Sequence, residues 1–498
     1  MKRIQSSILT FVAAVSLATV PVACGSYSGM GGSGGASGGA TGNPSGGATG
    51  NPSGGATGNP SGGTTVNPSG GTTVNPSGGT TVKPSGGSGG NGTGGATGSG
   101  GATGSGGATG SGGATSSGGR TGSGGATVSG GATLTGGSTV GSGGSTGTGG
   151  SSPGGLPCDI LTGAGQKCVS AHSTVRVIVT GYTGPLYEVC KGTANSGPSS
   201  CKGTKQDIQS KNGYADAAAQ DTLCSGATCT ITKIYDQSGM KNDLEPSPQG
   251  GVCGPDKPAN AADLKVTING NSAYGILIKA GIGYRTGCGG CNIKTGNGTA
   301  TGDQPESMYM VTSQKDLVNG CCFDYGNAET SSHDDGNGTM ETIYFGAGVV
   351  WGTGSGGGGG PWVEADEENG LYAGWENGQD KNISTNKPLK FDFVTAIVLG
   401  DTQDKNNKAG RFALYGADAT GADATYGKLV TMYDGIRPAK NGYVPMHKQG
   451  SIILGTGGDN SCSAGGRFYE GAVTSGPVAA QATLDALQAA IVAAKYGK

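Results

Sequence analysis

A long stretch of this chain contains almost nothing that a folded protein could bury. From Gly25 to about Gly155 it consists mainly of Gly, Ser, Thr, Ala, Asn and Pro, in recurring units such as Gly-Asn-Pro-Ser-Gly-Gly-Ala-Thr. Its only charged residues are Lys83 and Arg120. Such a segment cannot offset the entropy lost on ordering, and glycine-rich chains are flexible. We therefore predict a disordered linker over residues 25–155, acting as a tether, and a folded domain over residues 156–498.

The first 24 residues have the pattern of an export signal. Lys2 and Arg3 precede the mostly apolar run 8–20, which is too short to span a membrane. Cys24 follows Ala23, as at a bacterial lipoprotein processing site where the cysteine becomes the lipidated N-terminus. We expect a lipid anchor at Cys24 and a location outside the cell or on its outer surface, with plain secretion as the alternative. Either route permits disulfides.

The charge of the folded part argues against nucleic acid as a partner. The whole chain has a net charge of −2, and its 33 acidic residues all follow Leu156. A nucleic-acid-binding protein needs a basic footprint, which this part lacks. A neutral polymer such as a polysaccharide suits this surface better, and we expect the protein to act as a monomer.

Short runs rich in Val, Ile, Tyr and Phe recur through the folded part, separated by Gly, Asn, Asp and Pro. Two stretches, Tyr214–Cys224 and Pro477–Lys495, have the composition or spacing of helices. Many short strands with few helices predict an all-β sandwich or jelly roll. The runs expected to form strands are Val175–Thr180, Thr230–Tyr235, Ser307–Thr312, Glu341–Phe345, Phe391–Leu399, Arg411–Tyr415, Lys428–Tyr433, Ser451–Leu454 and Arg467–Ala472.

The cysteines indicate an oxidised framework. Of 13 cysteines, those left after Cys24 are even in number. Cys321 and Cys322 are adjacent, so they either pair with two distant partners or bond to each other in a strained ring. Cys288-Gly-Gly-Cys291 is interpreted as a small-loop disulfide, because the three histidines are too scattered for a zinc site. Cys253 and Cys462 are left to pair by exclusion. We expect no metal and no cofactor.

The available chemistry lies in carboxylates within glycine-rich, aromatic surroundings. One cluster is the run 361–370, and another is the run 457–461 directly after an apolar strand. A pair of carboxylates is the minimum equipment for hydrolysing a glycosidic bond. From pattern alone, surface turns and calcium ligands remain alternatives for such acidic loops.

Seven ordered motifs closely resemble the catalytic domain of the α-L-arabinofuranosidase B family of retaining glycoside hydrolases. The resemblance extends from Pro157 to Tyr496 and implies a concanavalin-like two-sheet jelly-roll β-sandwich. It also implies removal of terminal α-L-arabinofuranosyl residues from arabinan or arabinoxylan by double displacement. The motifs are Pro157–Ile160, Cys168–Ser173, Tyr182–Tyr187, Ile234–Gly239, Gly320–Thr330, Trp351–Gly356 and Ile452–Ser461.

The resemblance also implies roles for individual residues. The family nucleophile falls on Glu368 and the family acid/base on Asp459. The family's disulfides fall on Cys158–Cys168, Cys224–Cys229 and Cys321–Cys322, the last lining the sugar pocket. The other substrate-binding positions fall on Trp351, Asp366, Asn369 and the backbone of Gly458.

This chain departs from the family pattern in three ways. Glu367 replaces a residue that is usually apolar, so it either perturbs the pKa of Glu368 or faces solvent. Cysteines beyond the family's usual set include Cys462, which lies three residues after Asp459 and could stiffen its loop. The arabinose-binding domain that follows the catalytic domain in fungal members is not expected here.

A non-catalytic carbohydrate-binding sandwich anchored at the cell surface is the alternative function.

Overall fold

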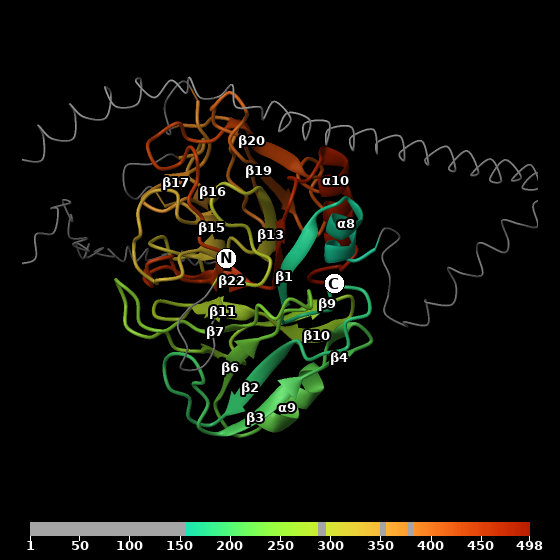
Figure 1. Cartoon of the computed structure of the whole chain (residues 1–498). Helices are drawn as coiled ribbons and strands as arrows, with labels where there is room; N and C mark the ends of the chain where they lie inside the picture. The colour runs from blue at the N-terminus through green and yellow to red at the C-terminus, as the bar shows by residue number, and fades with distance from the viewer. Residues whose placement is uncertain (1–154, 287–294, 349–354, 377–381) are drawn as a thin grey trace, which may run out of the picture. The chain divides into compact units, whose positions relative to one another are not determined.

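The computed structural model describes residues 155–286, 295–348, 355–376 and 382–498. Two antiparallel sheets dominate this part of the chain. One is six-stranded, in the order β1-β23-β13-β18-β19-β20, and the other is eleven-stranded, running from β17 to β3. Strands β15 and β16 of the large sheet contact β18 and β19 of the small one, so the sheets pack face to face. The expected two-sheet jelly-roll sandwich is confirmed, and Figure 1 shows its later elements gathered at one end.

The strands of the six-stranded sheet are β1 (Lys167–Ser173), β13 (Glu306–Thr312), β18 (Val394–Gly400), β19 (Arg411–Asp418), β20 (Val430–Ile436) and β23 (Glu470–Ser475). The large sheet contains β2 (Tyr187–Lys191), β3 (Thr204–Ile208), β6 (Cys229–Ile234), β7 (Leu244–Pro246), β8 (Ala259–Asn260), β12 (Tyr284–Thr286), β14 (Asp324–Ala328), β15 (Glu341–Gly346), β16 (Trp362–Asp366), β17 (Leu371–Tyr372) and β21 (Ser451–Leu454). Three short pairs join β4 (Ser210–Lys211) to β5 (Tyr214–Ala215), β9 (Lys265–Ile268) to β10 (Asn271–Tyr274), and β11 (Ile276–Ile278) to β22 (Gly466–Phe468).

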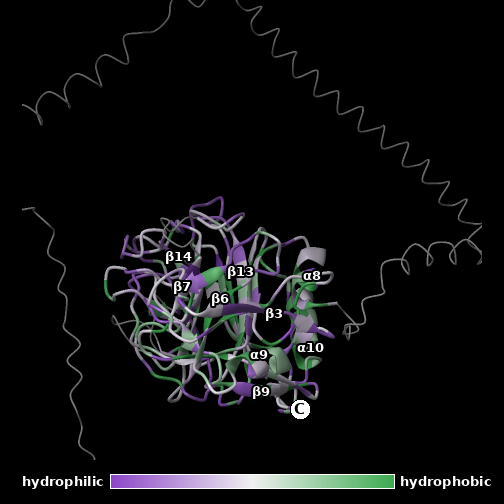
Figure 2. Cartoon of the chain, turned by 90° about the horizontal axis from the view of Figure 1, so that it is seen from below, coloured by the Kyte–Doolittle hydropathy of each residue, from purple (hydrophilic) through white to green (hydrophobic). Residues whose placement is uncertain are grey.

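The helices are α8 (Pro157–Gly163), α9 (Ala217–Cys224) and α10 (Gln481–Val492). α8 and α10 contact each other, and Figure 2 shows them together on one side of the sandwich. Leu484, Leu487 and Ile491 of α10 are buried in the core, as their helical spacing predicts. Within the described part of the chain, no helix is long and apolar enough to cross a membrane.

Most expected strands form, but the run Val175–Thr180 does not. The strand is instead β1, which ends at Ser173. The Ser173 hydroxyl accepts hydrogen bonds from the backbone N–H groups of Val175 and Arg176, and this turn ends the ladder. Val175 and Ile178 are buried without belonging to a strand, so their apolar character reflects packing in the core.

The expected helix Tyr214–Cys224 starts three residues late. Tyr214 and Ala215 pair with β4, and the side chain of Asp216 then accepts a hydrogen bond from the Ala219 N–H as the N-cap. The helix α8 was not predicted at all, because its seven residues are too short for a helical pattern to appear in the sequence.

Candidate active site

Strand pairing places acidic side chains on one face of the large sheet. Asp366 pairs with Thr342, Thr342 with Gly326, Gly326 with Ile453, and Ile453 with Arg285. Paired residues share a face, and their neighbours along each strand point to the other one. The alternate row, which includes Ala365, Ile343 and Tyr325, is buried in the core between the sheets. The face that carries Asp366 is therefore the outer face of the large sheet.

The predicted nucleophile lies in a tight turn directly after β16. Glu368 and Asn369 have φ angles of 60° and 57°, a left-handed conformation that is costly for residues other than glycine. The Glu368 N–H donates to Oδ1 of Asp366 (3.1 Å), and the Tyr443 hydroxyl donates to the Glu368 carbonyl (2.8 Å). The Asn369 side chain donates to Oδ1 of Asp334 (3.0 Å). These bonds hold the turn in place from both sides.

The predicted acid/base lies in the loop that follows β21. Oδ1 of Asp459 accepts hydrogen bonds from the backbone N–H (2.8 Å) and hydroxyl (2.5 Å) of Ser461. The carbonyls of Gly457 and Gly458 both accept from the buried guanidinium of Arg285, at 2.9 and 2.6 Å. Arg285 thus ties this loop to the centre of the sheet.

A disulfide joins the acid/base loop to a distant segment. Cys253 and Cys462, 209 residues apart in sequence, are bonded, as pairing by exclusion suggested. Beside this bond, the Val252 N–H donates to the carbonyl of Asp459 (3.2 Å). The structure also forms the bonds Cys158–Cys168, Cys190–Cys201, Cys224–Cys229 and Cys321–Cys322, whereas Cys288 and Cys291 lie outside the described residues.

The adjacent cysteines, Cys321 and Cys322, form a bond to each other beside Asp366 on the outer face of the large sheet. Cys322 is buried against Tyr344 and Leu371, and its Sγ lies 3.3 Å from Oδ2 of Asp366. These sulfurs and the Asp366 carboxylate are close enough together to hold an ion. A cysteine binds a metal ion as a thiolate, and sulfurs joined in a disulfide are not thiolates, so the group does not fit a metal.

Glu329 is a site residue that the sequence did not single out, although it lies inside the motif Gly320–Thr330. It is fully buried, and it accepts a hydrogen bond from the Thr339 hydroxyl (2.6 Å). Its carboxyl group lies close enough to that of Glu368 for the two to shift each other's pKa. A Cβ atom at position 458 would collide with Oε2 of Glu329, so this position requires glycine.

Burial and mutual repulsion raise the pKa values of the acidic groups. Burial raises the pKa of Glu368, and the charges of Glu329 and Asp366 raise it further. The pKa of Asp366 rises to about 8 for the same two reasons, burial first and Glu329 second. Asp324 behaves in the same way, with burial and then Asp366 as causes. The site therefore retains protons on some of its carboxyl groups near neutral pH.

The predicted site residues within the described part of the chain lie close together. The carboxylates of Asp366 and Asp459 are both close enough to Glu368 to raise its pKa, and Gly458 abuts Glu329. Trp351 lies outside the described residues. Glu367 is fully buried, so the expectation that it might face solvent is wrong. Glu367 directly follows β16, and the alternation of the strand continued by one residue places it on the core side, opposite Asp366.

Comparison with known proteins identifies the family of this chain. The family model for the catalytic part of α-L-arabinofuranosidase B matches residues 157–497. An α-L-arabinofuranosidase B of Emericella nidulans is 47% identical over 349 residues, covering 68% of this chain and 62% of the relative. An α-L-arabinofuranosidase of Hypocrea jecorina is 46% identical over 345 residues, covering 68% of this chain and 63% of the relative.

Solved structures are similar over the same region. An arabinofuranosidase complexed with arabinofuranosyl-α-1,2-xylobiose is 43% identical, with a TM-score of 0.60, covering 69% of this chain and 66% of the other. An α-L-arabinofuranosidase soaked with a cyclic sulfate inhibitor is also 43% identical with a TM-score of 0.60, covering 68% and 66%. This chain spans less than two thirds of the length of these relatives. Because the family model matches well over half of the chain, the chain belongs to the family of α-L-arabinofuranosidase B catalytic domains.

Proposed function

We propose that this protein is a retaining α-L-arabinofuranosidase that releases terminal arabinofuranosyl residues from arabinose-containing polysaccharides. The observation that carries the proposal is the convergence of two carboxylate loops, those of Glu368 and Asp459, beside the Cys321–Cys322 bond. A pair of carboxyl groups with different surroundings is what double displacement requires.

In the proposed mechanism, Glu368 attacks the anomeric carbon while Asp459 donates a proton to the leaving oxygen. A covalent arabinosyl-enzyme forms, and Asp459 then removes a proton from the water that releases arabinose. Glu368 has to be ionised for the attack, so the proton that burial and the neighbouring Glu329 favour on Glu368 has to leave before the nucleophile reacts. In this proposal the furanose is bound by Asp366, Asn369, Trp351 and the Gly458 backbone. The disulfide forms the apolar floor under the ring.

The substrate class draws support from related proteins. One solved relative holds arabinofuranosyl-α-1,2-xylobiose, and a second was soaked with 4-nitrophenyl α-L-arabinofuranoside. Both compounds carry a terminal arabinofuranosyl group, so we propose that the same group fills the site of this chain. No metal or cofactor has a part in the proposed steps.

Release of 4-nitrophenol from 4-nitrophenyl α-L-arabinofuranoside tests the proposal. We expect turnover by the wild-type protein, with proton NMR of the first-formed arabinose showing the α anomer. Arabinan and arabinosylated xylan should both release arabinose, and their rates identify the preferred polymer. A folded wild-type protein that binds arabinosides without hydrolysing them would instead support the non-catalytic carbohydrate-binding alternative.

We further propose that the enzyme is a monomer held outside the cell, on its outer surface, by a lipid on Cys24. Residues 1–24 would be the export signal and residues 25–155 the tether between anchor and enzyme. The sequence pattern around Cys24 supports this. Mass spectrometry of the N-terminal peptide should find a diacylglyceryl cysteine, and Cys24→Ala should release the enzyme into the medium. Membrane retention of that variant would contradict the anchor.

A further inference from the structure

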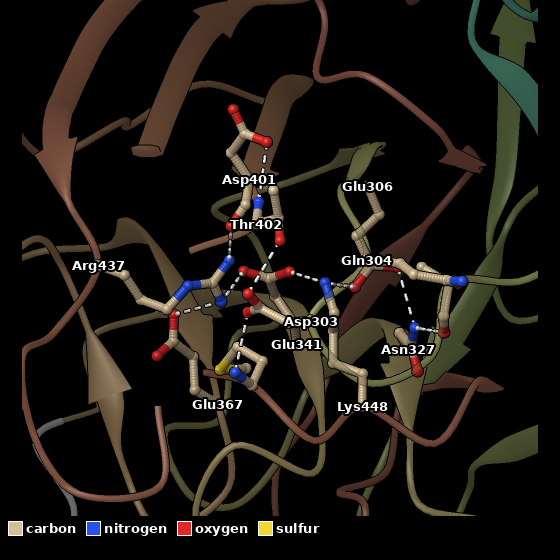
Figure 3. Close-up of polar contacts among 12 residues, drawn as sticks. Asp303, Gln304, Glu306, Asn327, Glu341, Glu367, Asp401, Thr402, Arg437 and Lys448 are labelled. Atoms are coloured by element: carbon tan, nitrogen blue, oxygen red, sulfur yellow. Dashed lines mark hydrogen bonds and ion pairs between the residues drawn. The ribbon is translucent and has the colours of Figure 1, made fainter. Parts of the chain in front are cut away.

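A cluster of buried charges lies on the core side of the sheet, directly behind the proposed nucleophile. It contains three carboxyl groups, from Glu306, Glu341 and Glu367, and two cations, Arg437 and Lys448. All five side chains are at most 2% exposed. Figure 3 shows the Glu341 carboxylate between the two cations. Glu306 lies on β13 and Glu341 on β15, whereas Glu367 follows β16, Arg437 follows β20 and Lys448 precedes β21. The cluster therefore joins both sheets.

The ion pairs form a chain with Glu306 at one end and Glu367 at the other. Nη1 of Arg437 lies 2.8 Å from Oε1 of Glu341 and 3.7 Å from Oε1 of Glu367. Nζ of Lys448 lies 3.0 Å from Oε2 of Glu341 and 3.1 Å from Oε1 of Glu306. Nη2 of Arg437 also donates to the carbonyl of Asp401 (3.0 Å), which fixes the guanidinium. Arg437 is therefore a rigid partner for Glu367.

The charges in the chain do not cancel, since three carboxyl groups face two cations. Although burial opposes ionisation, Arg437 and Lys448 lower the pKa of Glu341 to about 2. Burial raises the pKa of Glu306 to about 7 and that of Glu367 to about 8. The cluster thus keeps a proton at one of its ends near neutral pH, which reduces the cost of the surplus carboxyl group.

Glu367 connects this cluster to the catalytic turn. Asp366 and Glu368 flank it and serve the site, while its own side chain points into the core. Its backbone is also engaged, since the N–H donates to the Gly370 carbonyl (3.1 Å) and the carbonyl accepts from the Gly338 N–H (2.8 Å). Its carboxyl oxygens accept no hydrogen bond from the described residues. The ion pair with Arg437 is thus the polar contact that defines where this side chain lies.

We propose that Glu367 is a positioning residue for catalysis, whose polar contact with Arg437 (3.7 Å) anchors the left-handed turn and so orients the Glu368 carboxylate. The inference rests on the proposed function. A carboxylate must stand within a fraction of an ångström of its attack geometry, and a misplacement of about 1 Å costs on the order of a hundredfold in rate. The Glu367 side chain lies in the core and does not contact the sugar in this proposal, so its loss should affect kcat more than KM.

The test compares three variants by kinetics on 4-nitrophenyl α-L-arabinofuranoside and by thermal unfolding. Glu367→Leu removes the polar contact with Arg437 and should lower kcat about thirtyfold while KM changes less than about threefold. Glu367→Gln keeps the shape and a polar contact with Arg437, and should retain kcat within about threefold of the wild-type value. Glu306→Gln is the matched control, because it removes a buried carboxylate from the far end of the same cluster and should leave kcat nearly unchanged.

Two results would overturn the inference. One is a folded Glu367→Leu variant whose kcat stays within about threefold of wild type, and the other is an equal kcat loss in Glu306→Gln. If the leucine variant does not fold, Glu367→Asp withdraws the carboxylate from Arg437 by one methylene and should lower kcat about tenfold. If the wild-type protein is inactive, only the proposed function fails. Crystal structures of wild type and Glu367→Asp then decide, since an unmoved Glu368 carboxylate contradicts the anchor.

Discussion

Oδ2 of Asp366 lies 3.3 Å from Sγ of Cys322, so a carboxyl group and a disulfide share one wall of the proposed sugar site. The pKa of Asp366 is raised to about 8, chiefly by burial, so this carboxyl group holds a proton in the free protein near neutral pH. A protonated carboxyl group can donate a hydrogen bond, either to the sulfur or to a sugar hydroxyl. The disulfide therefore gives this wall a rigid apolar surface, and beside it the Asp366 carboxyl group can donate or accept a hydrogen bond.

Replacing Cys321 and Cys322 together by serine should weaken sugar binding more than it weakens the fold. The variant loses the apolar floor but keeps the strands on either side, so we expect KM for 4-nitrophenyl α-L-arabinofuranoside to rise about tenfold, or ~1.4 kcal/mol. Thermal unfolding should change by only a few degrees. Loss of the fold with an unchanged KM in the residual native fraction would show that the bond acts only as a staple.

Glu368→Gln should abolish turnover without unfolding the protein. The amide keeps the shape of the side chain but cannot attack the anomeric carbon, so kcat should fall at least about a thousandfold. Asp434→Asn changes an exposed ion pair on β20 and serves as a control that should retain full activity. Near-normal turnover by Glu368→Gln would move the nucleophile to another carboxylate, such as Glu364.

Gly458→Ala should damage the site through a steric effect. The new Cβ would collide with Oε2 of Glu329 and approach Sδ of Met340, so the acid/base loop has to move. We expect kcat/KM to fall at least about thirtyfold, because a small displacement of Asp459 impairs proton transfer. Gly163→Ala is a suitable control, since a Cβ there meets no atom within 4 Å. Equal activities of the two variants would show that the loop adapts without cost.

The two disulfides Cys253–Cys462 and Cys224–Cys229 should differ in what they stabilise. Their sequence separations are 209 and 5, so loop-closure entropy predicts losses of about 5 and about 2 kcal/mol when each pair is replaced by serine. Only the first bond holds the acid/base loop, so only its removal should also lower kcat. Urea unfolding and kinetics on both variants measure this. A larger effect on kcat from the shorter bond would contradict the role of Cys462.

Stability should fall as pH rises from about 4.5 to about 8. Burial raises the pKa of Asp366 and Glu367 to about 8, and that of Glu306 and Asp256 to about 7, above the unfolded values near 4. The folded state therefore binds more protons than the unfolded state in this window, which gives stability a negative slope with pH. The pKa of Glu341 is lowered to about 2, so this group changes stability only at pH values below this window.

Urea unfolding at pH 5 and pH 8 checks this slope. The midpoint should lie at higher urea at pH 5, and Glu306→Gln should reduce the difference because it removes one of the titrating groups. A midpoint that rises between pH 5 and pH 8 would show that the buried carboxyl groups are ionised and paired in the folded state.

Strands could be predicted where a short run was rich in apolar β-forming residues. The runs that became β13, β18, β19 and β21 were recognisable because buried strands are rich in Val, Ile and aromatic residues. Val175–Thr180 has the same composition but packs in the core as a loop, since a turn at Ser173 ends the ladder first. Composition reports burial, and only the hydrogen bonds distinguish a buried strand from a buried loop.

The candidate site divides in a similar way. Glu368, Asp459 and the adjacent cysteines stand in ordered motifs, so sequence alone identified them together with the family and the fold. Glu329 and the Glu367–Arg437 pair emerged only in three dimensions. Glu329 abuts Gly458 and Glu367 contacts Arg437, both far away in the chain, and no local spacing records such contacts. The alternation of β16, continued by one residue beyond Asp366, decides that Glu367 enters the core while Asp366 serves the site. Motif order thus determined the chemistry available to this protein, and strand register decided which carboxyl groups meet.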